Sequence, residues 1–69
     1  MNKEFERKRI GQRIASVRKE KGMSQTELAE RCGLAQSHIA RIEAGRYSVG
    51  FDTLQAIAEA LGGTIDILV

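Results

Sequence analysis

The chain has 69 residues, 42% hydrophobic and 29% charged, a balance typical of one small globular domain. Its single cysteine excludes an internal disulfide and a cysteine-rich metal site, and no apolar run approaches the roughly 18 residues of a membrane span. Residues 1–11 are too charged for a signal peptide, so we expect a reduced, cytoplasmic domain without metal or cofactor.

The net charge of +2 hides an asymmetry along the chain. Residues 1–46 hold all eleven basic residues against six acidic ones, a net charge of +5, whereas residues 47–69 hold three acidic residues and none that are basic. The basic part favours a surface that binds a polyanion, although an ordinary solvated helix face explains the same charges. Because so small a domain has a limited core, we also expect self-association.

Hydrophobic spacing and glycine stops predict four helices. The first spans about residues 4–21, with Ile10, Ile14 and Val17 as its apolar stripe. It contains Gly11, which costs up to about 1 kcal/mol relative to Ala inside a helix. A close backbone contact at this glycine would explain its presence.

The remaining helices are shorter. Residues 25–32 follow Ser24, a good N-cap, and Glu27 completes the pattern of a capping box. The third helix is predicted over 36–44 and the fourth over 51–61, each with apolar residues at helical spacing and a glycine after it.

The end of the chain changes to a period of two. Within residues 64–69, Ile65, Ile67 and Val69 alternate with other side chains, which predicts a short β-strand. A lone strand lacks a partner, so we predict antiparallel pairing with a second copy, and a packed or disordered tail is the alternative. The expected fold is therefore mostly α, a compact four-helix domain over 1–63 followed by a dimerisation strand.

The second and third helices are joined by a three-residue turn that contains Gly33, the arrangement of a helix-turn-helix. The second helix of such a unit lies in the DNA major groove. The exposed side of 36–44 lacks the Glu–Lys pairs of a merely solvated helix. The side chains there that can bond to base edges are Gln36, Ser37, Arg41 and, nearer the margin, His38.

Residues 22–29 and 33–45 resemble the lambda-repressor, Cro and Xre type of helix-turn-helix, and 52–62 resembles the helix that follows in that family. We therefore expect a sequence-specific transcriptional regulator that binds a palindromic operator as a homodimer. The predicted strand is similar to the tails of small antitoxin-type members. A protein that holds a toxin partner and binds DNA for autoregulation is thus the alternative function.

The resemblance also implies roles for single residues. It implies that Gln25 contacts a phosphate and braces Gln36, and that Arg18 and Glu43 form a structural salt bridge. Ala35 departs from the Ser or Thr that usually caps the third helix in this family. The further phosphate contacts that we expect are those of Ser24, Arg46, Tyr47 and Arg18.

Enzyme and metal chemistry are weaker interpretations. Cys32 lies on the inner side of the second helix, where a small core residue is more common than a nucleophile. His38 has no ligand at a useful spacing, and Ser24 has no catalytic histidine nearby. We expect no enzyme; non-specific nucleic-acid contact through the basic first helix is a further alternative to operator binding.

Overall fold

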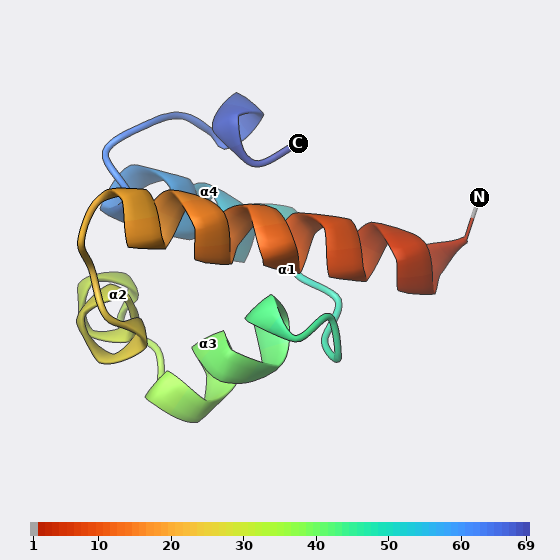
Figure 1. The fold of residues 1–69 in the computed structure, drawn as a ribbon, viewed down its shortest axis with the longest axis horizontal. Coiled ribbons are helices and arrows are strands. Elements are labelled where there is room, and N and C mark those ends of the chain that lie inside the picture. Colours follow the sequence, from red (N-terminus) through yellow and green to blue (C-terminus); the bar gives the residue numbers. More distant parts are fainter. Residues whose placement is uncertain (1) are drawn as a thin grey trace.

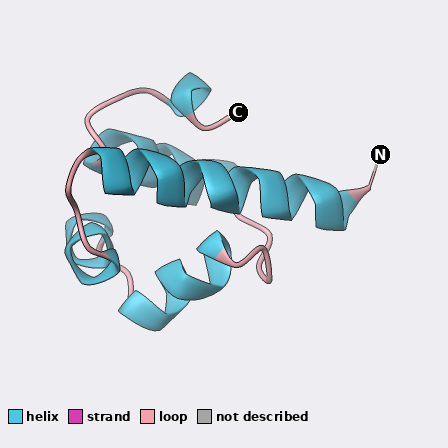
Figure 2. Ribbon diagram, viewed as in Figure 1, coloured by secondary structure: helices cyan, strands magenta, loops and turns pink. Residues whose placement is uncertain are grey.

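The computed structural model describes residues 2–69, which form four α-helices and a 3₁₀ turn (Figure 1). The elements are α1 (Lys3–Glu20), α2 (Gln25–Cys32), α3 (Gln36–Glu43), α4 (Phe51–Ala60) and η1 (Ile65–Ile67). Each helix begins and ends within one residue of its predicted range, which confirms the mostly helical fold. The part of the chain that the structure describes contains no strand (Figure 2).

The longest helix, α1, lies across the other three (Figure 1). Helix α4 lies behind it and runs in nearly the same direction, while α2 and α3 lie on another side. Helix α3 packs against both α1 and α2, and α4 packs against α2. The N-terminal turns of α1 extend beyond the other helices, so one face of these turns has no helix packed against it.

The core between these helices is aliphatic. Each helix contributes at least one fully buried large side chain, as the periodicity predicts. Together with Leu61, which caps the end of α4, and Leu68 of the C-terminal segment, the fully buried large side chains are Ile14, Leu28, Ile39, Ile42 and Ile57. The aromatic side chains Phe5, Tyr47 and Phe51 are exposed instead. None of the helices within residues 2–69 combines the length and apolar character needed to cross a membrane.

Side-chain caps fix the starts of two helices. Asn2 accepts a hydrogen bond from the backbone N–H of Glu4 (2.9 Å), and Ser24 accepts one from the backbone N–H of Glu27 (3.0 Å). The predicted capping box is wrong in its second half, because the carboxylate of Glu27 pairs with Arg31 (2.8 Å). Ala35 provides no side-chain cap, as expected for alanine.

The predicted strand over residues 64–69 is wrong. The backbone closes local bonds instead: the N–H of Ile67 donates to the carbonyl of Thr64 (3.1 Å), and that of Leu68 to the carbonyl of Ile65 (3.0 Å). The backbone N–H and C=O groups of a strand require a second strand beside it as hydrogen-bond partner. A 3₁₀ turn forms hydrogen bonds between its own backbone groups and needs no second strand.

Side-chain packing favours the same turn. Leu68, which strand alternation would turn away from the other apolar residues, is the one that is fully buried. Arg13 of α1 donates a hydrogen bond from Nε to the carbonyl of Ile67 (2.7 Å) and so ties the tail down. Ile65 and Ile67 pack against the chain's own core, and only Val69 is well exposed. The dimerisation role expected of these three residues therefore loses its structural basis.

Candidate DNA-binding surface

Helices α2 and α3 form a compact two-helix unit. Gly33 ends α2 in the left-handed conformation (φ 73°), which glycine adopts without steric cost, and the chain enters α3 three residues later. The side of α3 that carries Ile39 and Ile42 is buried against the core. The opposite side of α3 is exposed and presents Gln36, Ser37 and Arg41, with His38 half-buried at its margin.

A buried ion pair holds α3 to α1. Arg18 donates from Nε and Nη2 to the two carboxylate oxygens of Glu43 (2.7 and 3.0 Å), a bidentate arrangement. Its Nη1 donates to the carbonyl of Met23 (2.8 Å). The hydrogen bonds to Glu43 raise the pKa of Arg18 against the opposing effect of burial, so the guanidinium stays charged. Because Arg18 is only 8% exposed and bonds inward, its geometry is that of a structural residue.

The same carboxylate bonds to a glutamine. Gln25 donates from Nε2 to Oε1 of Glu43 (2.9 Å), and Gln36 donates from Nε2 to Oε1 of Gln25 (2.8 Å). A carboxylate only accepts hydrogen bonds, so Glu43 requires Gln25 to turn its amide nitrogen inward and its oxygen toward Gln36. Oε1 of Gln25 can only accept a hydrogen bond, so Gln36 must turn its amide nitrogen toward it. Charge on the buried carboxylate thus sets the orientation of an exposed side chain.

This orientation has a consequence for what Gln36 can bind. One of its two N–H groups is used by Gln25, which leaves the second N–H and Oε1 for another partner. A free donor and acceptor side by side match the N7 acceptor and N6 donor of adenine in the major groove. The hydrogen-bonded series also holds Gln36 in place before any ligand binds.

The residues at the start of α2 and after α3 flank this face. Ser24 is exposed, and because its oxygen accepts a bond at the helix start, its hydroxyl proton remains free to donate. Arg46 and Tyr47 are exposed in the loop after α3, where the N–H of Arg46 donates to the carbonyl of Arg41 (2.9 Å). Gln25, the first residue of α2, bonds to Gln36 of this face, and Tyr47 contacts His38 at its margin.

His38 and Tyr47 lie together at the margin of the face. Their rings meet edge to face, with centroids 4.6 Å apart and an interplanar angle of 61°. This contact joins the loop to α3. It could not be read from the sequence, because the path of the loop decides it.

The second role of Glu43 was also missed by the sequence interpretation, which assigned it only to the ion pair with Arg18. A signal was available: Glu43 lies two helical turns after Gln36, on the same side of α3. What the sequence lacks is the position of Gln25 between them.

The remaining candidate for chemistry is Cys32. It is half-buried, and its thiol faces the carbonyl of Ala56 at 3.9 Å. Burial raises the pKa of the Cys32 thiol, which makes it less reactive at neutral pH. Among residues 2–69, no three His, Cys, Asp or Glu side chains group so that they could hold a metal ion.

Comparison with known proteins identifies the unit. The helix-turn-helix family HTH_3 matches residues 14–68, which include α2, the turn and α3. The chain belongs to this helix-turn-helix family. The match confirms the family predicted from the sequence.

Relatives of this helix-turn-helix protein agree with that assignment. This chain is 43% identical over 60 residues to the immunity repressor protein of Bacillus phage phi105. The aligned residues cover 87% of this chain and 42% of the repressor. It is 39% identical over 56 residues to the uncharacterized HTH-type transcriptional regulator y4dJ of Sinorhizobium fredii, covering 81% of this chain and 73% of that protein. The chain thus spans less than half of the phage repressor.

A solved structure shows the same fold. The crystal structure of the restriction-modification controller protein C.AhdI from Aeromonas hydrophila matches with a TM-score of 0.89 and 32% sequence identity. The match covers 91% of this chain and 96% of C.AhdI. The arrangement of the four helices is therefore the same as in this solved controller protein.

Proposed function

We propose that this chain is a sequence-specific DNA-binding regulator of transcription that inserts α3 into the major groove. The observation that carries the proposal is the oriented amide of Gln36, held through Gln25 by the buried carboxylate of Glu43. A merely solvated helix face has no need of a side chain fixed from the core. The phage relative, named as a repressor, supports the same function.

The contacts divide into two classes. In the groove, Gln36 bonds to adenine and Arg41 to guanine, Ser37 bonds to either, and His38 reaches a base only at the margin. At the backbone, the N-terminus of α2 meets a phosphate, since its free N–H groups and dipole favour an anion. The side chains that would add phosphate contacts are Ser24, Gln25, Arg46 and Tyr47.

The operator proposed here is a palindrome, bound by two copies with half-sites about one helical turn apart. We also propose a cytoplasmic location, where a lone cysteine stays reduced. The antitoxin alternative rested on the predicted tail strand and on the charged segment 1–9 as partner surfaces. Residues 65–67 form a 3₁₀ turn instead of a strand, and the two relatives described above are named as a repressor and a transcriptional regulator, which favours the regulator.

Selection of bound DNA from a random library at near-physiological salt tests the function. We expect enrichment of one symmetric sequence, and we expect Gln36→Ala and Arg41→Ala to lose the preference for particular bases within it. Gln55→Ala makes the same chemical change on an exposed side of α4 and should select the parent sequence. Lys19→Ala should at most weaken binding to all sequences alike.

Two outcomes would contradict the proposal. If the library shows no enrichment, the protein does not read sequence, and a role in binding another protein is favoured. If Gln36→Ala and Arg41→Ala select the parent sequence, α3 does not read the bases.

A further inference from the structure

The loop between α3 and α4 carries two of the side chains proposed to contact phosphate, Arg46 and Tyr47. The start of this loop is fixed by backbone contacts. Gly45, in the left-handed conformation (φ 76°), lies so close to α1 that a Cβ atom there would be 2.9 Å from Cα of Lys8. The N–H of Arg46 donates to a carbonyl of α3 (2.9 Å). The backbone at Gly45 and Arg46 is therefore held by both helices.

The next three residues, 47–49, lack this support. Within residues 2–69, no hydrogen bond joins their backbone N–H and C=O groups to other backbone groups. A cavity of about 430 Å³ separates part of the segment from α1, with Ile10 of α1 on one wall and Val49 of the loop on another. Backbone hydrogen bonds and close packing on α1 therefore do not fix the position of Tyr47.

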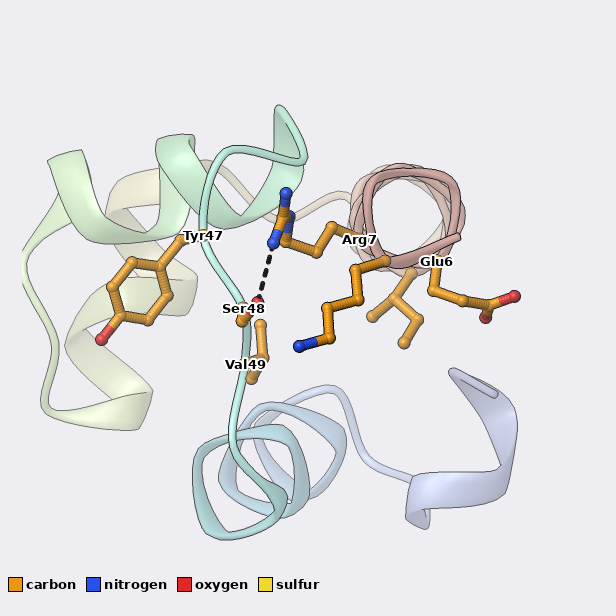
Figure 3. A pocket seen from close by; sticks show the side chains of 7 residues that line it. Glu6, Arg7, Tyr47, Ser48 and Val49 are labelled. Carbon is orange, nitrogen blue, oxygen red and sulfur yellow. Dashed lines mark hydrogen bonds between the residues drawn. The ribbon is translucent and has the colours of Figure 1, made fainter. Parts of the chain in front are cut away.

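Side chains hold the segment instead. Val49 packs against the core, and the ring of Tyr47 meets the ring of His38. Ser48 accepts a hydrogen bond from Nη1 of Arg7 (3.2 Å), a contact that reaches from α1 to the loop beside the cavity (Figure 3). In Figure 3, Arg7 approaches the loop from the side of α1, and the ring of Tyr47 extends on the other side. Arg7 thus holds the residue next to Tyr47 from the side away from its ring.

Arg7 is bonded to the loop rather than to a carboxylate. It forms no ion pair in the part of the chain that the structure describes. Glu6, which also lines the cavity, bonds through Oε1 to Arg9 (2.7 Å). The Nε of Arg7 is buried without a hydrogen-bond partner, an arrangement that costs free energy. An arginine that served stability alone would pair with a carboxylate or extend into water, so this position of Arg7 indicates a role in holding the loop.

We propose that Arg7 is a positioning residue for DNA binding, which acts through Ser48 to hold the loop where the hydroxyl of Tyr47 donates to a phosphate. The inference rests on the proposed function, because the phosphate contact belongs to it. A loop that is ordered before binding does not pay the entropy of ordering when DNA binds. Phosphate contacts carry no direct sequence information, so Arg7 acts on affinity for DNA and leaves base preference unchanged.

The first test measures the order of the loop by NMR in the free protein. We expect backbone order parameters of about 0.85 for residues 47–49 in the parent and below about 0.6 in Ser48→Ala. The nuclear Overhauser contact between the rings of Tyr47 and His38 should be present in the parent and lost in this variant. Ser48→Ala removes only a hydroxyl and keeps every charge. Ser48→Thr keeps a hydroxyl and should behave like the parent.

The second test measures affinity for the duplex enriched from the library and for a scrambled duplex of the same length. We expect Ser48→Ala and Arg7→Gln each to raise the dissociation constant about tenfold on both duplexes. The double variant should bind no more weakly than Arg7→Gln alone, since the two side chains share one hydrogen bond. Lys19→Gln is the matched control for lost charge, because Lys19 is an exposed cation elsewhere on α1, and its loop should stay ordered.

A third comparison tests whether Ser48 acts through Tyr47. Tyr47→Phe keeps the ring that meets His38 and removes the hydroxyl, so it loses the phosphate contact while the loop stays in place. Adding Ser48→Ala to Tyr47→Phe should then weaken binding by about twofold at most, compared with about tenfold in the parent background.

The outcomes separate this inference from the proposed function. Equal order parameters in Ser48→Ala and the parent overturn the hold of Arg7 on the loop. A disordered loop with unchanged DNA affinity overturns its role in binding, and an equal loss with and without the Tyr47 hydroxyl overturns the assigned phosphate contact. A library that enriches no sequence overturns only the proposed function, because the NMR test needs no DNA and the scrambled duplex still reports affinity.

Discussion

Gly11 in the middle of α1 lies directly against the end of α3, so that a Cβ atom at Gly11 would be 2.7 Å from the carbonyl oxygen of Glu43. The carbonyl of Ile42 would be closer still. This contact explains why a glycine occupies a helix interior, where it is otherwise unfavourable. It also sets the approach of α3 to α1 that the Arg18–Glu43 ion pair requires.

We therefore predict that Gly11→Ala destabilises the protein. Alanine favours the helix by up to about 1 kcal/mol, but pushing two backbones apart costs about 1–3 kcal/mol. Urea unfolding followed by circular dichroism measures the balance. Gly50→Ala is the control, because Gly50 has an ordinary φ of −71° and a Cβ there would meet nothing within 4 Å. A stabilised Gly11→Ala variant would mean that α1 and α3 lie farther apart.

The second prediction concerns the ion pair of Arg18 and Glu43, whose side chains are 10% and 6% exposed. Arg18→Met leaves a buried carboxylate without its cation, and we expect a loss of about 3–5 kcal/mol in the free energy of unfolding. The double variant Arg18→Met with Glu43→Leu removes both charges and should be more stable than Arg18→Met alone. Thermal unfolding of the parent, the two single variants and the double variant gives the coupling.

The same double variant separates stability from recognition. It removes the carboxylate that orients Gln25, so Gln36 loses its brace even where the fold survives. We expect it to bind DNA with weaker base preference, measured on operator and scrambled duplexes. If the double variant discriminates as well as the parent, the hydrogen-bonded series does not serve recognition.

The third prediction follows from the C-terminal segment. Leu68 is fully buried, so Leu68→Ala should lower the free energy of unfolding by about 2–5 kcal/mol. Val69→Ala, at an exposed neighbour, should change it little. Molecular mass measured under folding conditions should not change in either variant. Dissociation of a dimer in Val69→Ala would instead restore a role for the tail in self-association.

How far the sequence predicts this structure differs between its parts. Helical periodicity is a local property, so the four helices and the cap at Ser24 could be placed within a residue or so. The tail could not, because apolar residues at 65, 67 and 69 fit a strand while those at 65 and 68 fit a turn. Only the packing of Leu68 and the anchor from Arg13 decide between these patterns.

The candidate site also has a part that local sequence patterns predict and a part that depends on how the helices pack. Its exposed α3 residues follow from the helix period, and the Arg18–Glu43 pair was implied by the family resemblance. The bond from Gln25 to Glu43 depends on the angle between three helices, and the contact of His38 with Tyr47 depends on the path of the loop after α3. Neither quantity is encoded in a local pattern.

The last prediction concerns pH. Burial raises the pKa of the Cys32 thiol in the folded protein, so the fold favours the neutral thiol over the thiolate. Below the thiol's ordinary pKa both states keep the proton, and this contribution to stability is fully present. As pH rises through the folded pKa, the unfolded chain has already ionised and the contribution is lost.

Alkylation of Cys32 by iodoacetamide near pH 8 should thus be slower in the native protein than in urea. The variant Cys32→Ala should lose less stability than the parent between neutral and alkaline pH. Equal alkylation rates in the two states would show that Cys32 is not protected by the fold.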